Sequence, residues 1–225
     1  TIERAEELGI TPDNASWEIR LLHYQLSEVF RTNPGIILYL AIYPKPAGGN
    51  YTFAELKTLQ RYASGRLRQV GIWLGDKAAD ASLVTTLAGV ADTLDIEGMP
   101  LSVLLAPKVT SPVASLPTNL AGGGKLRVSI LIAQDGEGVA KTLYTDTANN
   151  ATKASVSALG TFLGILSRAA VHHSIGWVQK YPLGLALPAF GDGTLLRALD
   201  KAVVETLDKA RYIFAVTYPA IGDCY

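Results

Sequence analysis

Two adjacent histidines and a serine offer the most obvious chemistry in this sequence. His172, His173 and Ser174, with Asp192 further along the chain, are the residue types of a hydrolase, in which a base activates a nucleophile and a carboxylate orients the base. No serine stands in the G-x-S-x-G pattern of a nucleophile elbow, and neighbouring side chains point in different directions. We therefore expect structural or surface histidines and no catalytic residue.

A metal site is not expected either. His23 is the only other histidine, and the single cysteine, Cys224, stands next to the last residue. A zinc site would need carboxylates from scattered loops to complete its ligands. The sequence predicts no metal ligand.

The segment from Gly136 to Gly138 resembles the start of a dinucleotide-binding loop, in which glycines let a pyrophosphate approach the backbone. Lys141 stands where the third glycine should be, and no acidic residue follows about 20 positions later to hold a ribose. A turn is the preferred interpretation.

A second glycine-rich segment, Gly122–Lys125, invites comparison with a phosphate-binding loop. Asn119 stands in the place of the first glycine, and Leu126 in the place of the Ser or Thr that binds magnesium. These glycines also precede a predicted strand rather than a helix. We expect a loop here, and no bound cofactor.

The end of a predicted strand, Trp73–Lys77, is the best remaining position for a small ligand. Asp76 and Lys77 lie at the edge where open α/β sheets usually bind ligands. The alternative, which we prefer, is that Asp76 caps the next helix beside a solvated lysine.

The overall charge argues against polyanionic partners. Lys and Arg number 20, and Asp and Glu also number 20, so no net charge attracts nucleic acid or anionic lipid. No apolar run approaches the roughly 20 residues of a membrane span. A lone cysteine near the end of the chain favours a reducing compartment, with the cytosol as the simplest choice. We expect neither a nucleic acid nor a membrane as partner.

Helical and strand patterns alternate along the chain. Apolar residues at helical spacing predict five helices: one that starts at Thr11 and Pro12 and stops at Asn33, then Phe53–Ala63, Leu83–Leu94, Thr152–Ala170 and Leu196–Leu207. Short apolar runs predict strands, of which the first is expected to be covered on both faces: Ile36–Tyr43, Gln69–Leu74, Leu101–Ala106, Arg127–Ala133 and Tyr212–Thr217. Ile175–Gln179 and Leu183–Leu187 are weaker strand candidates.

This alternation predicts the fold class. Strands that alternate with helices favour an α/β fold with a mainly parallel open sheet, flanked by helices and joined by right-handed crossovers. The polar segment 134–150 is expected to be a loop with at most a short strand, so a small inserted or antiparallel part is allowed.

One predicted helix, Thr152–Ala170, carries glycines inside it. Gly160 and Gly164 each cost about 1 kcal/mol relative to alanine in a helix interior. Close packing against a neighbour is the expected explanation.

Aromatic residues near the end of the chain suit an assembly surface or a core equally well. Tyr181 and Tyr218, each followed by a proline (Pro182 and Pro219), are the candidates for such a surface.

We expect one α/β domain over residues 1–225, with approximate sub-regions 1–125 and 126–225. The sequence begins at Thr1 and ends soon after the apolar stretch Tyr212–Val216. It is therefore expected to be a processed product or a piece of a longer chain.

The segment Thr152–Thr194 resembles the core of contractile tail sheath proteins of Mu-like phages and related prophage elements. The closing sequence RYIFAVTYPAIGDCY is similar to the strand that follows the last core helix of that family. The resemblance covers the last third of the chain, and the features that carry it are Ala158, Leu159, Gly160, Leu163, Gly164, Ser174–Trp177 and Gly191–Gly193.

This resemblance implies a structural protein of a virion or prophage contractile injection system, and not an enzyme. It implies self-assembly into a helical tube, contraction as rigid subunits rearrange, and a tail tube protein as partner. It also implies assembly in the bacterial cytoplasm and a final place in a virion or phage-tail-like particle. The alternative is an α/β enzyme or small-ligand-binding domain that uses the strand end Trp73–Lys77.

Overall fold

The computed structural model describes residues 1–78, 80–108, 116, 127–132, 134–135, 156–170, 172–175, 180–182, 184, 188–189, 195, 198–218 and 222–224. Within these ranges the backbone alone is described at 75–76, 108, 134–135, 188–189, 217–218 and 222–224. The predicted loop at 107–124, both glycine-rich segments and Asp192 therefore lie wholly or mostly outside the described residues.

Four parallel strands form the central sheet. Their spatial order is β1 (Gln69–Ala78), β2 (Ser102–Lys108), β3 (Val128–Leu131) and β7 (Tyr212–Ile213). Consecutive residues of β2, Val103 to Ala106, are all at most 4% exposed, so side chains on both faces of the sheet are covered. The predicted α/β class with a mainly parallel sheet is confirmed.

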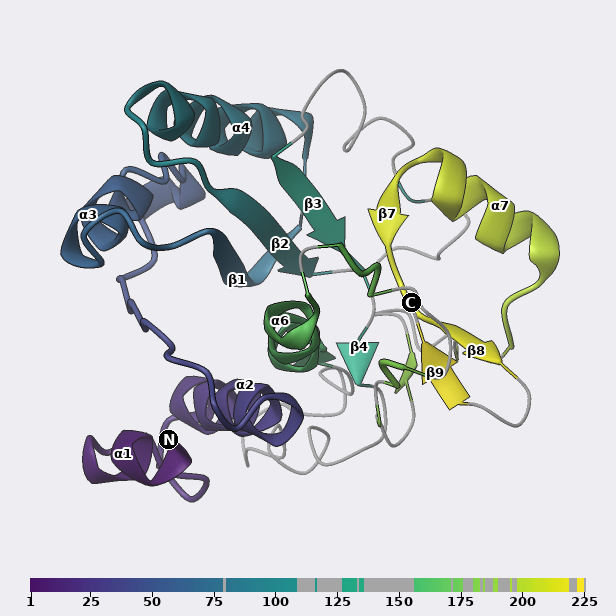
Figure 1. The fold of residues 1–225 in the computed structure, drawn as a ribbon, viewed down its shortest axis with the longest axis horizontal. Helices are drawn as coiled ribbons and strands as arrows, with labels where there is room; N and C mark the ends of the chain where they lie inside the picture. The colour runs from purple at the N-terminus through teal and green to yellow at the C-terminus, as the bar shows by residue number, and fades with distance from the viewer. Residues whose placement is uncertain are drawn as a thin grey trace.

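Helices lie on both sides of this sheet (Figure 1). Figure 1 shows α3 (Glu55–Tyr62) and α4 (Ala81–Ile96) on one side and α6 (Leu159–Arg168) on the other. α2 (Trp17–Thr32) packs against α6, and α1 (Ile2–Glu7) packs on α2, so these helices extend the fold away from the sheet. α7 (Lys201–Lys209) leads into β7, and a short 3₁₀ turn covers Ala47–Gly49.

Short strands form two smaller antiparallel sheets. β4 (Gln134–Asp135) lies between β5 (Val156–Ser157) and β6 (Pro188–Ala189). β8 (Val216–Tyr218) pairs with β9 (Gly222–Cys224). The predicted last strand, 212–217, is thus split between two sheets, because the chain leaves the parallel sheet after Ile213.

Three predicted helix starts are wrong. The last helix, predicted from Leu196, begins at Lys201 after the N-cap Asp200. Thr11 and Pro12 lie between α1 and α2, and the N-cap of α2 is Ser16, whose hydroxyl accepts from the Ile19 amide at 3.5 Å. The side chain of Asn14 accepts from the Ser16 amide at 2.9 Å and stabilises a turn before α2. The helix therefore begins after this turn, at Trp17. The fourth predicted helix starts at Leu159 because the residues just before it pair with β4.

Asp76 is not a helix cap. It lies within β1, which extends to Ala78, and α4 begins at Ala81. The cap is Asp80, whose carboxylate accepts from the Leu83 amide at 2.8 Å, and this hydrogen bond lowers the pKa of Asp80. The sequence pattern indicated a capping aspartate but placed it four residues too early.

The glycines of α6 let this helix approach α2 closely, as predicted. A Cβ at Gly160 would meet the backbone of Gln25, 2.9 Å from its carbonyl carbon. A Cβ at Gly164 would lie 2.7 Å from the carbonyl oxygen of Val29. Both distances are below ordinary van der Waals contact, so only glycine fits at these positions.

Side chains of α2 also satisfy the start of α6. The buried amide of Gln25 accepts from the Gly160 N–H and donates to the Ser157 carbonyl, both at 2.6 Å. The first N–H groups of a helix have no partner within it, so Gln25 caps α6 from another helix. Thr161 adds a hydrogen bond to Glu28 at 2.7 Å. The two helices are therefore joined by both close packing and side-chain hydrogen bonds.

Candidate interaction surface

The segment Ile36–Tyr43, which we call the arm, is the most unusual feature of the described surface. It follows α2, belongs to no helix or strand, and runs as a drawn-out trace from α2 toward α3 (Figure 1). Ile37 is 83% exposed, Ile42 is 61% exposed and Tyr43 is 47% exposed. The prediction of a strand covered on both faces is wrong here, because no strand among the described residues pairs with the arm.

Backbone groups of the arm are left without partners in the described part of the chain. The Ile36 amide donates to the Asn33 carbonyl at 3.4 Å. From Ile37 to Tyr43, no backbone N–H or C=O bonds to a described backbone group. Extended backbone with free donors and acceptors is a template for pairing with another strand.

Two side chains hold the arm to the rest of the molecule. Leu38 packs against a small core cluster that includes Ala5 and Leu26. The ring of Tyr39 meets that of Tyr62 edge to face, with centroids 6.3 Å apart, and its hydroxyl accepts from Arg66 at 3.0 Å. The arm is therefore positioned although most of its apolar surface stays exposed.

Exposed apolar side chains concentrate at this place. Seven large hydrophobic residues are exposed in the described chain, and four of them lie in the arm: Ile37, Leu40, Ile42 and Tyr43. A fifth, Tyr62, touches Tyr39. Scattered exposed residues are ordinary, whereas a contiguous group marks an interaction site.

The histidine cluster does not form a catalytic arrangement in the described residues. The rings of His172 and His173 stack edge to face with centroids 4.2 Å apart. Nδ1 of His173 lies 3.2 Å from the Tyr181 hydroxyl and 3.2 Å from Nζ of Lys180. Lysine only donates, so His173 accepts through Nδ1, which faces Lys180 and Tyr181.

At the predicted ligand position Trp73–Lys77, the two described side chains with printed contacts, Trp73 and Lys77, both contact other side chains of the protein. Trp73 meets Trp17 edge to face, with centroids 6.5 Å apart. Lys77 pairs with Asp80 at 3.4 Å. The side chain of Asp76 lies outside the described residues.

For Tyr181 and Pro182, which the sequence allowed at either an assembly surface or a core, the structure buries the tyrosine ring and leaves the proline exposed. Tyr181 is 4% exposed and belongs to the main core. The side chain of Tyr218, and Pro219, lie outside the described residues. The exposure of the arm was missed because an apolar run has the same sequence signature whether or not a sheet covers it.

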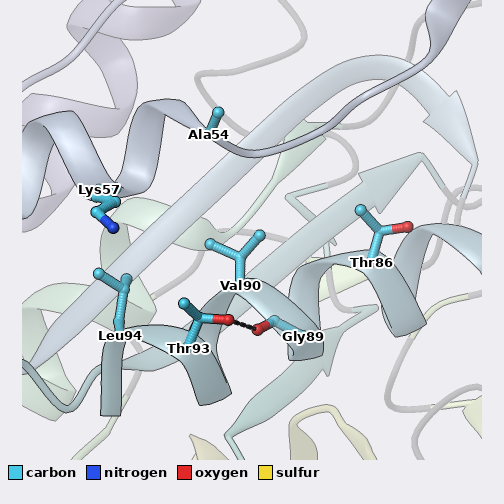
Figure 2. Close-up of a pocket in the computed structure, with 7 residues that line it drawn as sticks. All are labelled: Ala54, Lys57, Thr86, Gly89, Val90, Thr93 and Leu94. Atoms are coloured by element: carbon cyan, nitrogen blue, oxygen red, sulfur yellow. Dashed lines mark hydrogen bonds between the residues drawn. The ribbon is translucent and has the colours of Figure 1, made fainter. Parts of the chain in front are cut away.

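A shallow depression of about 290 Å³ lies between α3 and α4, as Figure 2 shows. Hydroxyls of Thr86 and Thr93 donate to carbonyls of their own helix, at 3.0 and 2.8 Å. Lys57 forms an ion pair with Glu97. The depression therefore presents mostly methyl groups and no reactive side chain.

A larger cleft, of about 440 Å³, lies at the amino ends of β1, β2 and β3. It combines polar side chains with an apolar wall from the end of α6: Arg68, Gln69, Ser102, Arg127, His173, Leu166, Ala169 and Ala170. It lies at the opposite edge of the sheet from Trp73–Lys77. Polar groups with an apolar wall can hold an anionic side chain.

Other kinds of site find no support among the described residues. No group of three or more His, Cys, Asp or Glu side chains is placed to hold a metal ion there. In the same part of the chain, every helix is too short or too polar to cross a bilayer.

Comparison with known proteins gives one match. A family model described as DUF2586, N-terminal domain, matches residues 3–225, which is almost the whole chain. No curated protein and no solved structure matches.

Proposed function

The chain belongs to the DUF2586 N-terminal domain family, and we propose that it is a structural subunit that assembles with copies of itself, as contractile tail sheath subunits do. The single observation that carries this proposal is the arm. An isolated globular domain gains nothing from an extended apolar segment held in water, whereas an assembling subunit gains a contact.

The arm has both components of a strand-mediated contact. Its free backbone groups can pair with a strand of another copy, which is recognition by β-augmentation. Burial of a side chain such as Ile37, now 83% exposed, adds about 1.5 to 3 kcal/mol. Two such isoleucines and a tyrosine in one arm offset part of the free energy that association costs, and backbone pairing adds to this gain.

The sheath resemblance adds the geometry of the assembly. The residues that carry it include Gly160 and Gly164, the positions that lock α6 to α2 into one packed unit. A rigid subunit suits a helical tube whose contraction moves subunits as whole bodies. In this proposal the tube surrounds a tail tube protein, is built in the bacterial cytoplasm and ends in a virion or a phage-tail-like particle.

Negative-stain electron microscopy and sedimentation velocity of the chain test the proposal. The wild type should form oligomers that grow with concentration, with rings or tubes in the images. The double variant Ile37→Asp/Ile42→Asp should be monomeric, because each substitution puts a charge into the contact.

The matched control is Ile96→Asp. Ile96 is 87% exposed at the end of α4 and is not part of the arm, so this variant should assemble as the wild type does. Assembly that survives the double arm substitution contradicts the proposal. A monomeric wild type that binds a small ligand, with binding lost in Asp76→Ala, would favour the strand-end site of an enzyme or ligand-binding domain instead.

A further inference from the structure

The depression between α3 and α4 is an apolar surface that stays open to water. Figure 2 shows one face of α4 along it, and the α4 residues that line it from this face are Thr86, Gly89, Val90 and Thr93. The hydroxyls of Thr86 and Thr93 donate to carbonyls of their own helix. Both threonines therefore offer methyl groups to whatever fills the depression, which favours an aliphatic occupant.

Gly89 stands in this wall for no reason within its own copy. Glycine is the least favourable residue in a helix interior apart from proline. A Cβ at Gly160 or Gly164 of α6 would collide with α2, whereas a Cβ at Gly89 would meet nothing within 4 Å. The glycine of α4 therefore leaves space that the described chain does not use, and a backbone from outside could come close there.

The second half of the arm supplies aliphatic side chains with no cover. Leu38 and Tyr39 hold the first half to the molecule, but every residue from 40 to 45 is exposed. We call Leu40–Tyr43 the arm tip. Leu40 and Ile42 are 43% and 61% exposed, so they do not fill the depression of their own copy.

The arm tip and the depression agree in size. The depression holds about 290 Å³, and a dry cavity of about 150 Å³ is enough for a molecule as large as benzene. Thr86 and Thr93 are seven helical residues apart, which is about 10 Å along α4. Leu40 and Ile42 are two residues apart, at most about 7 Å along any chain, so both side chains can enter together.

The charges beside the two surfaces are also complementary. Lys45 follows the arm tip, is exposed and forms no ion pair with a described carboxylate. The end of α4 and the residue after it hold three carboxylates and no cation: Asp92, Asp95 and Glu97. Lys57 pairs with the last of these, and Arg127 lies 2.5 Å from the second and 3.9 Å from the first. Three carboxylates against two cations leave one negative charge for the lysine of another copy.

From these observations we propose that the arm tip of one copy docks into the α3–α4 depression of a second copy. The proposal rests on the proposed function, because it names the surface on which the arm binds. Leu40 and Ile42 would leave water against Val90 and the threonine methyl groups. The arm tip and the depression are different patches, so the contact is head to tail and can repeat from copy to copy.

Filling the depression tests this contact. Gly89→Leu adds a side chain where the structure leaves open space, and leucine is a much better helix former than glycine. The variant should be at least as stable as the wild type in urea unfolding of the monomers. It should nevertheless associate at least about tenfold more weakly in sedimentation velocity. A residue that acted only through folding would change both measurements in the same direction.

Ala81→Leu is the matched control. Ala81 is an exposed residue of the same helix and does not line the depression. This variant adds an equally large apolar side chain, so it should associate as the wild type does. Gly89→Leu that associates as the wild type does would overturn the proposal.

A mixture of two variants identifies the occupant. Gly89→Leu keeps a normal arm, and Ile37→Asp/Ile42→Asp keeps an open depression. Each should be largely monomeric at a concentration at which the wild type associates. Their equimolar mixture leaves one productive pairing, the arm of the first in the depression of the second, and should form a 1:1 complex that does not grow. A mixture that forms no complex would overturn the proposal.

The same variants separate this contact from the proposed function. If the arm variant is monomeric but Gly89→Leu associates normally, the arm binds elsewhere and only the docking site is overturned. If the arm variant associates as the wild type does, the proposed function fails as well. Binding of 1-anilinonaphthalene-8-sulfonate by the monomeric arm variant, lost when Gly89→Leu is added although Gly89→Leu alone still associates, would replace the proposal with a small-ligand site.

Discussion

Replacement of Gly160 by alanine tests the close crossing of α2 and α6. The added Cβ would lie 2.9 Å from the carbonyl carbon of Gln25, 3.0 Å from its Cα and closer still to its carbonyl oxygen. These are backbone atoms, so no rotamer change relieves the contact. The helices would have to separate, and the two 2.6 Å hydrogen bonds of the Gln25 amide would lengthen with them.

Two opposing effects set the magnitude. Alanine in place of glycine favours a helix by up to about 1 kcal/mol. Overpacking costs about 1 to 3 kcal/mol, and weakened hydrogen bonds to buried groups add about 1 to 3 kcal/mol. We therefore expect Gly160→Ala to lower the free energy of unfolding by about 2 to 4 kcal/mol.

Urea unfolding followed by far-ultraviolet circular dichroism measures this loss as a lower midpoint at an unchanged slope. Gly89→Ala in α4 is the control, because a Cβ there meets no atom within 4 Å. That variant should be more stable than the wild type by about 0.5 to 1 kcal/mol. If Gly160→Ala also proves neutral or stabilising, the close crossing of the two helices is refuted.

Three further predictions concern stability. Asp80→Ala should cost about 1 kcal/mol at neutral pH; the lowered pKa of Asp80 means that its contribution is present above its unfolded pKa of about 3.9 and is lost as the pH falls through the lower folded value, so acid titration of both proteins should show their stabilities converging. Gln25→Ala should cost about 2 kcal/mol or more in urea unfolding, because the buried Ser157 carbonyl and Gly160 amide both lose a partner; a loss below about 0.5 kcal/mol would contradict this. Burial raises the pKa of Tyr212 to about 12, so its contribution is complete below pH of about 10 and is lost as the pH rises to about 12; Tyr212→Phe should show a smaller loss over that interval, and equal losses would argue against a buried phenol.

The sequence located most of the regular elements. Runs such as Gln69–Leu74 and Leu101–Ala106 form paired parallel strands. Short apolar segments bounded by turn residues are typical of strands that are buried on both faces of a parallel sheet. Leu83, Leu87 and Leu94 lie on the buried side of α4, as their spacing requires. The spacing of apolar residues predicts these elements well because it indicates which side chains become buried.

The positions at which helices and strands begin and end depend on tertiary contacts, which a local sequence pattern does not show. α6 starts where β5 ends, and the N–H of Gly160 in its first turn is satisfied by Gln25, which is 135 residues away from Gly160. The cap of α4 is Asp80 and not the predicted Asp76, because β1 continues past the predicted end of the strand. In both cases a tertiary partner decided the boundary.

The candidate surfaces were hidden from sequence reasoning for a related reason. The apolar arm has the composition of a buried strand, and only its position beside no sheet shows that it is exposed. Likewise Arg68 and Arg127 are far apart in the chain, and the pairing of β1, β2 and β3 brings both to one cleft.

By itself, the sequence determined the alternation of strands and helices, the α/β class and the need for close packing at Gly160 and Gly164, because these follow from local periodicity and from the size of side chains. The tertiary structure alone decided which apolar run stays outside the core and which charges gather, because burial and electrostatic potential depend on neighbours that are distant in the chain.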